Sequence, residues 1–508
     1  MENLHSGLKN FAQNKPNRIA ITYLDQTLTF RSLYRRVNRL ANFLLDLGVR
    51  KGDHISLFMR NRLEMPEIYF AISAVGAVAL PINYMMEGNN LIQLLNQSDA
   101  QYIFVEEEQL STLEKINEKL HFIRPETTIV VGPSIKGKYL DYEKVLSEGS
   151  EEDPGISVSP EDVAIILYSS GTTSLPKGIV LTQKVMMNRA IRAALDWGLN
   201  YSSVVLISVP MYHSVGQLYT MIFGLTGCKI VISREFLSET TLQLIQEHQI
   251  NHAFFVPTQY HLLLGEPTFS EYKLSSLNLL VSAAAPLSQA RKKAIIENFN
   301  CKLTEFFGCT ETGLIVTLHS EDVIRKADSL GQQVEYTEVR LVDEKGNDVG
   351  VGEEGEFVAR GPLVFCGYYQ RKIETKEAFL PGGWLRTGDM GQRDTEGFYY
   401  LLGRKKDMII SGGVNIYPRD IEETILTHHD IADVAVVGIP DEVWGEAVKA
   451  FVVVKAGQRC TEEEIIHYCN ERLAKFQRIK QVEFISSLPY NPSGKVMKNE
   501  LRKRQIQV

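Results

Sequence analysis

A loop of hydroxyl side chains and glycines, YSSGTTSLPKG at residues 168–178, has the chemistry of an anion-binding site. It follows an apolar run, residues 163–167, and ends in a lysine. Glycines permit positive φ and close backbone approach, so several N–H groups can converge on a phosphate, and the hydroxyls add donors. The loop is not a P-loop, GxxxxGK[ST], because Lys177 follows Pro176 and precedes Gly178. The pattern favours a polyphosphate ligand; an ordinary Ser/Gly surface loop is the alternative.

Length and composition indicate a large folded protein with several compact units. A chain of 508 residues is too long for one hydrophobic core, and three or four units are expected. Hydrophobic residues make up 44% and charged residues 23%, and the net charge of -8 gives no indication of nucleic-acid binding. The six cysteines lack CxxC spacing, which predicts reduced thiols rather than disulfides or a zinc site.

The sequence predicts a cytoplasmic location. The polar start, MENLHSGLKNFAQNKPN, has no signal-peptide core. The longest nearly unbroken apolar run, residues 68–82, is too short to span a bilayer and contains Ser73. We expect this run to be a buried helix.

Helical and strand periods alternate along the chain, which is typical of α/β proteins. Short apolar runs at 54–59, 129–131, 204–209 and 279–281 predict parallel strands buried on both faces. After residue 330 the pattern changes to alternating strands, at 337–342 and 355–360, and βα alternation resumes from Gly403. We therefore expect a large N-terminal domain of stacked α/β subdomains plus a β-rich subdomain, residues 1–403, and a small α+β C-terminal domain, residues 404–508.

Eight motifs in a fixed order resemble those of the adenylate-forming, or AMP-binding, superfamily, which includes acyl-CoA synthetases, peptide-synthetase adenylation domains and beetle luciferases. They are LTF (28–30), the loop above, PMYHSVG (210–216), SAAAPL (282–287), FFGCTET (306–312), GWLRTGD (383–389), GRKKDMIISGGVNIYP (403–418) and PSGK (492–495). The resemblance spans nearly the whole chain. It implies that a carboxylate attacks the α-phosphate of ATP, releasing pyrophosphate, and that a thiol such as coenzyme A then opens the acyl adenylate.

The resemblance also implies roles for individual residues. Glu311 would hold Mg²⁺, Phe307 would stack on adenine where the family usually has tyrosine, and Asp389 would accept the ribose hydroxyls. The implied catalytic residues are Lys495, His213, Thr172 and Glu311. The implied ATP-binding residues are Ser169, Ser170, Gly171, Thr172, Thr173, Lys177, Ala283, Ala284, Ala285, Phe307, Gly308, Thr310, Asp389, Arg404 and Lys495.

Lys495 would bridge the incoming carboxylate and the α-phosphate, and a mobile C-terminal domain would then turn about a hinge at Lys406. Gly412 and Gly413 would line the coenzyme A tunnel in the turned state; a plain β-turn is the alternative reading of this pair. His213 would gate the acyl pocket, which has no aspartate to pair with a substrate ammonium, so an amino acid substrate is disfavoured. The candidate pocket residues are Tyr212, His213, Val215, Gly216, Gln217, Val281 and Phe306.

The function expected from the resemblance is an ATP-dependent carboxylate:CoA ligase acting on a medium- or long-chain fatty acid. Its cofactors would be ATP, Mg²⁺ and coenzyme A, and its partners small molecules rather than nucleic acid. The alternatives are an aryl or other acid CoA ligase, an acyl-AMP or carrier-protein ligase, and a non-catalytic nucleotide-binding regulatory protein. The oligomeric state stays open, with a homodimer among the options.

Overall fold

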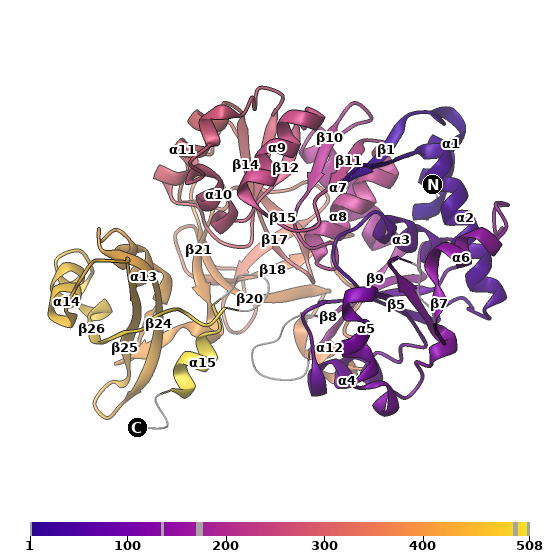
Figure 1. Ribbon diagram of the computed structural model, residues 1–508. Helices are drawn as coiled ribbons and strands as arrows, with labels where there is room; N and C mark the ends of the chain where they lie inside the picture. Colours follow the sequence, from indigo (N-terminus) through magenta and orange to yellow (C-terminus); the bar gives the residue numbers. More distant parts are fainter. Residues whose placement is uncertain (1–2, 134–136, 169–175, 491–495, 505–508) are drawn as a thin grey trace. The chain divides into compact units, whose positions relative to one another are not determined.

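The computed structural model describes residues 3–133, 137–168, 176–490 and 496–504, and the chain forms two compact units (Figure 1). The first unit takes most of the chain up to Glu338 and includes Arg360–Phe379. The second takes Val339–Ala359 and the chain from Leu380 onward. The predicted α/β alternation is confirmed, and the domain boundary at residue 403 stays a prediction.

A nine-stranded sheet in the first unit has the order β16-β15-β14-β13-β12-β10-β11-β1-β2. The strands from β14 to β1 in this order are parallel, and the outer pairings at both ends are antiparallel. The bounds are β1 Ile19–Tyr23, β2 Gln26–Thr29, β10 Val204–Ile207, β11 Lys229–Ile232, β12 His252–Phe254, β13 Leu279–Ser282, β14 Lys302–Cys309, β15 Gly313–Leu318 and β16 Gln332–Gln333. The predicted strands at 204–209 and 279–281 are confirmed as β10 and β13.

A seven-stranded sheet of the same unit has the order β7-β6-β5-β3-β4-β8-β9, parallel except for the antiparallel pair β8 and β9. Its bounds are β3 His54–Phe58, β4 Val78–Ile82, β5 Tyr102–Glu106, β6 Thr128–Val131, β7 Leu140–Asp141, β8 Val163–Tyr168 and β9 Gly178–Thr182. The burial of β3, β4 and β6 explains why their sequences are mostly apolar.

Helix α2 buries one apolar stripe. In α2 the buried residues include Leu33, Val37, Leu40 and Leu44, at helical spacing, and the Thr29 side chain caps the first turn. The bounds are α1 Leu4–Asn14, α2 Phe30–Asp46, α3 Glu64–Ala74, α4 Gly88–Gln97, α5 Glu107–Glu114, α6 Tyr142–Glu148, α7 Gln183–Asp196, α8 Ser214–Thr226, α9 Ser238–His248, α10 Pro257–Leu264, α11 Gln289–Phe299 and α12 Lys372–Ala378.

The prediction of a single buried helix over residues 68–82 was wrong. Helix α3 ends at Ala74, and strand β4 begins at Val78. Gly76 lies between them at φ 69, a conformation that glycine adopts without strain and that ends the helix. Both elements are almost completely buried, so hydrophobicity alone could not separate them. No helix in the described ranges has both the length and the apolar character needed to cross a membrane.

Two smaller sheets follow, both five-stranded. In the first, β20 pairs with β18, β19 and β21, and β17 extends it beyond β18; the bounds are β17 Glu338–Val342, β18 Gly355–Arg360, β19 Phe379–Leu380, β20 Trp384–Arg393 and β21 Tyr399–Arg404. The second has the order β23-β22-β25-β24 with β26 beside β25. Its elements are β22 Ile409–Ser411, β23 Val414–Ile416, α13 Pro418–Leu426, β24 Ile431–Asp441, β25 Gly445–Val454, α14 Glu462–Asn470, β26 Ile479–Phe484 and α15 Lys498–Lys503.

Candidate active site

Three of the sequence motifs follow parallel strands of the nine-stranded sheet. PMYHSVG comes after β10, the alanines at 283–285 come after β13, and the turn containing Glu311 comes after β14. Parallel strands present their carboxyl ends at one edge of a sheet, which is where ligands of α/β proteins commonly bind. The fold therefore gathers residues that are about a hundred positions apart in sequence.

The turn that presents Glu311, between β14 and β15, is held by a buried arginine. Arg189 on α7 donates hydrogen bonds to the backbone carbonyls of Glu311, at 3.0 Å, and Leu363, at 2.8 Å. Burial lowers the pKa of Arg189 to about 10, so the guanidinium stays charged at neutral pH. Gly313 has φ 70, and a Cβ there would lie 2.9 Å from Arg189 Nε, so both conformation and space call for glycine.

Lys177 and Glu311 are brought to the same tyrosine. Residues 366–369 run beside β9, with hydrogen bonds from Val180 N to Gly367 O and from Tyr369 N to Gly178 O. This pairing places the Tyr368 hydroxyl 3.2 Å from Glu311 Oε1 and the ring centroid 4.8 Å from Lys177 Nζ. Burial and the Glu311 carboxylate raise the pKa of Tyr368, so its hydroxyl is protonated and donates to the carboxylate.

The proposed adenine-binding segment lies at the end of β14. Phe307 is half-buried, Gly308 is exposed, and Thr310 lies half-buried in the turn. The register of β14 against β15 shifts between Phe307 and Gly308. A Cβ at Gly308 would collide with the Gly313 carbonyl, so this irregularity requires glycine.

The three alanines after β13 differ in conformation. Ala283 is buried, whereas Ala284 and Ala285 are exposed. Ala284 has φ 75, in the left-handed region that costs an alanine but not a glycine. The role of these three alanines as a small wall beside the nucleotide stays a prediction, and Ala284 adopts a conformation that a glycine would adopt without strain.

His213 lies at the N-terminus of α8, at the residue that precedes the first helical turn. It is exposed to solvent, yet the protein atoms packed around it lower the pKa of its imidazole. The ring is therefore neutral at physiological pH, with Nδ1 3.3 Å from Ser214 Oγ. A neutral imidazole can accept or donate a hydrogen bond without adding charge.

The acyl-pocket candidates lie either at the start of α8 or on the strands β13 and β14. Tyr212 precedes α8 and makes an edge contact with Tyr84, with ring centroids 5.9 Å apart. Gln217 is fully buried in the first turn of α8, where Nε2 lies 3.3 Å from the Tyr212 carbonyl. The remaining candidates are Val215 and Gly216 on α8, Val281 on β13 and Phe306 on β14.

Gly216 has a packing role that the sequence did not indicate. A Cβ at this position would lie 2.4 Å from the Pro210 carbonyl oxygen. The absence of a side chain lets α8 begin directly against the turn before it.

Phe306 packs in an aromatic group, with its ring 5.7 Å from Trp197 and 6.0 Å from Phe254.

Asp389 and Arg404 form an ion pair within the second unit. They are cross-strand partners in the β20–β21 hairpin, and Arg404 Nε lies 2.8 Å from Asp389 Oδ1. Arg404 also donates to the Thr387 carbonyl at 3.2 Å, and the Asp389 carboxylate is buried. The arginine thus orients the carboxylate that the sequence assigns to the ribose.

The proposed hinge and tunnel residues lie just after β21. Lys406 is in the 3₁₀ turn Lys405–Asp407. Gly412 and Gly413, at φ 58 and 80, are the two central residues of the turn between β22 and β23, because Ser411 pairs with Val414. Positive φ at both positions is the type I′ hairpin geometry. A Cβ at Gly412 would meet the Trp444 ring at 2.7 Å, whereas none of the described atoms lies within 4 Å of a Cβ at Gly413.

Six of the assigned residues lie outside the described ranges. They are Ser169, Ser170, Gly171, Thr172, Thr173 and Lys495. Their roles stay predictions. The structure does show that the loop after Tyr168 joins the antiparallel strands β8 and β9 rather than a strand and a helix, which agrees with the exclusion of a P-loop.

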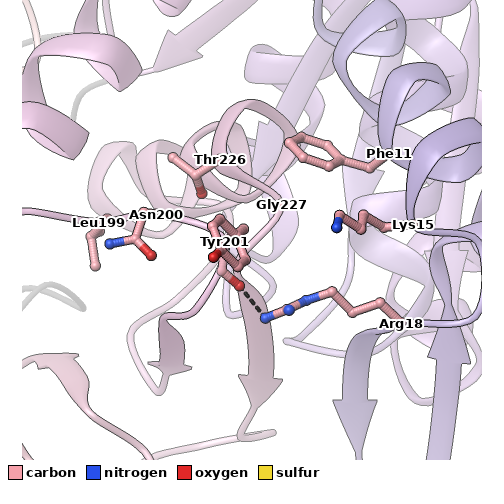
Figure 2. A pocket seen from close by; sticks show the side chains of 8 residues that line it. All are labelled: Phe11, Lys15, Arg18, Leu199, Asn200, Tyr201, Thr226 and Gly227. Atoms are coloured by element: carbon pink, nitrogen blue, oxygen red, sulfur yellow. Dashed lines mark hydrogen bonds between the residues drawn. The ribbon is translucent and has the colours of Figure 1, made fainter.

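A pocket of about 380 Å³ lies elsewhere in the first unit (Figure 2). Figure 2 shows Phe11, Lys15 and Arg18 on one side of it and Tyr201 opposite, where Arg18 donates to the Tyr201 carbonyl. Arg18, Tyr201 and Gly227 precede β1, β10 and β11, so the pocket is at the amino ends of these parallel strands. It is therefore at the opposite edge of the sheet from the motif residues.

Two residues of the site were missed by sequence reasoning. Tyr368 belongs to no motif named above, and its only sequence signal is the aromatic pair that follows Gly367. Arg189 appears in sequence as one of several polar residues on an amphipathic helix, with no sign that it is buried. The side chains of both residues contact segments that are distant in sequence, which a single sequence does not display.

Comparisons with known proteins agree with this arrangement. A family model described as AMP-binding enzyme matches residues 8–369, and one described as AMP-binding enzyme C-terminal domain matches residues 420–495. The long-chain-fatty-acid–CoA ligase FadD13 of Mycobacterium tuberculosis (strain ATCC 25618 / H37Rv) is 31% identical over 512 residues, covering 99% of both chains.

Relatives named for other acids match equally well. Feruloyl-CoA synthase of Amycolatopsis sp is 31% identical over 496 residues, covering 97% of both chains. The crystal structure of the anthranilate CoA ligase AuaEII in complex with anthranoyl-AMP has a TM-score of 0.91 at 28% identity, covering 99% of this chain and 97% of the other.

Proposed function

Because this chain belongs to the AMP-binding enzyme family, we propose that it is an ATP-dependent carboxylate:CoA ligase. In the first step a carboxylate attacks the α-phosphate of ATP, giving an acyl adenylate and pyrophosphate. In the second, the thiol of coenzyme A attacks the acyl carbon and AMP leaves. The two steps need a site that binds two anions together and then admits a sulfur nucleophile.

The observation that supports this proposal most is the meeting of Lys177 and Glu311 at Tyr368. A lysine at the end of the phosphate loop supplies positive charge, and a carboxylate nearby supplies hard oxygen ligands for Mg²⁺. Glu311 fits the metal role because its carboxylate is oriented by the Tyr368 hydroxyl and its turn is fixed by Arg189. When bound, Mg²⁺ would neutralise phosphate charge.

The chain's own residues have positioning roles in this scheme. Lys177 and the loop before it hold the β- and γ-phosphates, Phe307 stacks on adenine, and Asp389 accepts the ribose hydroxyls with Arg404 orienting it. Lys495 neutralises charge between the carboxylate and the α-phosphate during adenylation. These groups act by proximity and electrostatics, which are the main sources of catalysis in transfers at phosphorus.

We propose a medium- or long-chain fatty acid as the substrate. The pocket candidates are predominantly apolar, and a relative named for long-chain fatty acids matches the whole chain. An aryl acid is the second candidate, because Phe306 belongs to an aromatic group with Trp197 and Phe254 and because a feruloyl-CoA synthase is equally similar. Coenzyme A is the proposed acceptor, and a carrier-protein thiol is the alternative.

A substrate panel tests the proposal. The purified full chain would be incubated with ATP, Mg²⁺ and coenzyme A, and with fatty acids of increasing length, cinnamic and benzoic acids, dicarboxylates or amino acids. Mass spectrometry would detect each acyl-CoA, and pyrophosphate release would be followed in parallel. We expect thioester formation with a fatty or aryl acid. Tight ATP binding without pyrophosphate release for any acid would instead indicate a regulatory nucleotide-binding protein.

A further inference from the structure

A compact group of metal-ligand side chains lies in the C-terminal part of the second unit, outside the proposed reaction site. His428, His429 and Asp430 occupy the loop between α13 and β24. Within the described ranges they are the only group of three or more His, Cys, Asp or Glu residues whose ligand atoms could share a metal ion. Imidazole and carboxylate together suit borderline divalent ions such as Zn²⁺.

The distances are close to those of a coordination sphere. One ligand atom from each of the three side chains lies within 4.8 Å of the other two, and His429 Nε2 is 3.0 Å from Asp430 Oδ2. Ligand atoms about 2.0 Å from a tetrahedral zinc ion are about 3.3 Å apart. The side chain of His429 is 82% exposed, so a change of rotamer can close the remaining gap.

The backbone of this loop is already held in place. His428 N donates to Ile425 O at 3.0 Å, Ile431 N donates to His428 O at 3.2 Å, and Lys455 N donates to Asp430 O at 2.8 Å. Asp430 is buried, and His428 packs edge-on against Tyr468 with ring centroids 4.8 Å apart. Two of the three ligands are thus oriented before any ion binds, which lowers the entropy cost of binding.

Two cations lie near this loop: Lys455 Nζ donates to the His429 carbonyl at 2.7 Å, and Arg472 lies over the ring of Tyr468, 3.7 Å from the centroid, on which His428 packs. The two imidazole rings stack, with centroids 4.7 Å apart.

We propose that His428, His429 and Asp430 form a binding site for a divalent transition-metal ion of the Zn²⁺ type, with water completing the coordination. The site would tie the end of α13 to the start of β24. It would stabilise the folded C-terminal part by mass action, because the folded loop orients His428 and Asp430, whereas the unfolded chain must order them on binding. It is independent of the ligase reaction.

Zinc titration of the untagged full chain tests the proposal. Calorimetry would be run without nucleotide and with excess Mg²⁺, which occupies hard oxygen sites. We expect one equivalent of Zn²⁺ to bind and the affinity to fall roughly tenfold or more in His428→Gln and Asp430→Asn. His467→Gln is the matched control, because His467 is an exposed histidine of α14 paired with Glu471 at 3.3 Å, and it should bind zinc like the wild type.

Histidine modification gives a second measurement that needs no variant. Zn²⁺ should protect His428 and His429, but not His467, from diethylpyrocarbonate, as mapped by mass spectrometry. The proposal is wrong if the wild type binds no zinc at about 0.1 mM, or if both variants bind like the wild type. Equal protection of all three histidines would also overturn it. Circular dichroism of each variant distinguishes loss of the site from loss of the fold.

Discussion

The hydroxyl of Tyr368 donates a hydrogen bond of 3.2 Å to Glu311 Oε1, while Lys177 Nζ lies over its ring, 4.8 Å from the centroid. One aromatic side chain thus contacts Lys177, which the resemblance assigns to ATP binding, and Glu311, which it assigns to the metal. The contact depends on the pairing of residues 366–369 with β9. The position of Glu311 relative to Lys177 is therefore set by a third segment of the chain.

Tyr368→Phe should weaken the use of Mg·ATP without unfolding the protein. The ring and its contact with Lys177 remain, and only the hydrogen bond to Glu311 is lost. A hydrogen bond to a carboxylate contributes about 1 kcal/mol or somewhat more, so kcat/KM for ATP should fall by roughly fivefold to tenfold. Steady-state kinetics at varied Mg²⁺ would measure this.

Tyr369→Phe is the matched control for that change. Its hydroxyl donates to Asp99 Oδ2 at 2.7 Å, away from Glu311, so the kinetics should stay close to those of the wild type. Equal kinetics for Tyr368→Phe and the wild type would contradict the role of Tyr368 in orienting the carboxylate.

Much of the fold could be predicted because local sequence determines it. The strands β8, β10 and β13 have nearly continuous hydrophobic sequences, and α2 has an apolar stripe that ends before Gly48. The helix–strand break at Gly76 was missed, because α3 and β4 are both buried on all sides and only one glycine separates them. Hydrophobic periodicity carries no signal where every face is buried.

The candidate site was predictable in part for a different reason. Glu311, Asp389 and Arg404 stand in motifs whose order resembles a family, and the structure adds the Asp389–Arg404 ion pair that joins two of them. Tyr368 and Arg189 could not be found in this way. Tyr368 is positioned by backbone hydrogen bonds to β9, and the Arg189 side chain donates to carbonyls more than a hundred residues away, contacts that no local pattern records.

Gly413→Leu should impair the thioester step more than adenylation. If the β22–β23 turn lines the coenzyme A tunnel, a bulky side chain there would obstruct the thiol but not ATP or the acid. We expect thioester formation from supplied acyl adenylate to fall by at least roughly tenfold, with little change in acid-dependent pyrophosphate exchange. Separate assays of the two half-reactions measure this.

Gly457→Leu controls for backbone strain in that comparison. Gly457 has φ 82, against 80 for Gly413, and at both glycines none of the described atoms lies within 4 Å of an added Cβ. The strain is therefore similar, while the location differs. A greater loss of adenylation than of thioester formation in Gly413→Leu would argue against the tunnel.

Burial of His252 should make the protein less stable in acid. Its pKa is lowered from 6.5 to about 3 by burial, with Nε2 2.8 Å from the Tyr219 hydroxyl. Between these pH values the unfolded chain binds a proton at this position and the folded chain does not. The free energy of unfolding therefore falls as pH drops below 6.5, by at most about 1.4 kcal/mol per pH unit from this group.

His252→Gln removes this titration and should reduce the pH dependence of stability between pH 6.5 and 4.5. Urea denaturation at several pH values would give the slope of the unfolding free energy against pH for each protein. A loss of stability that is the same at every pH does not change this slope. The exposed His121→Gln should retain the wild-type slope. An unchanged slope in His252→Gln would show that the ring is protonated in the folded state.

The most direct test of the two-step account is to separate the half-reactions in Lys495→Ala. Acid-dependent pyrophosphate release should be abolished, and thioester formation from supplied acyl adenylate and coenzyme A should be largely retained. Lys503→Ala, an exposed lysine of the nearby helix α15, should leave both half-reactions intact. Equal loss of both half-reactions in Lys495→Ala, or undiminished pyrophosphate release, would contradict the account.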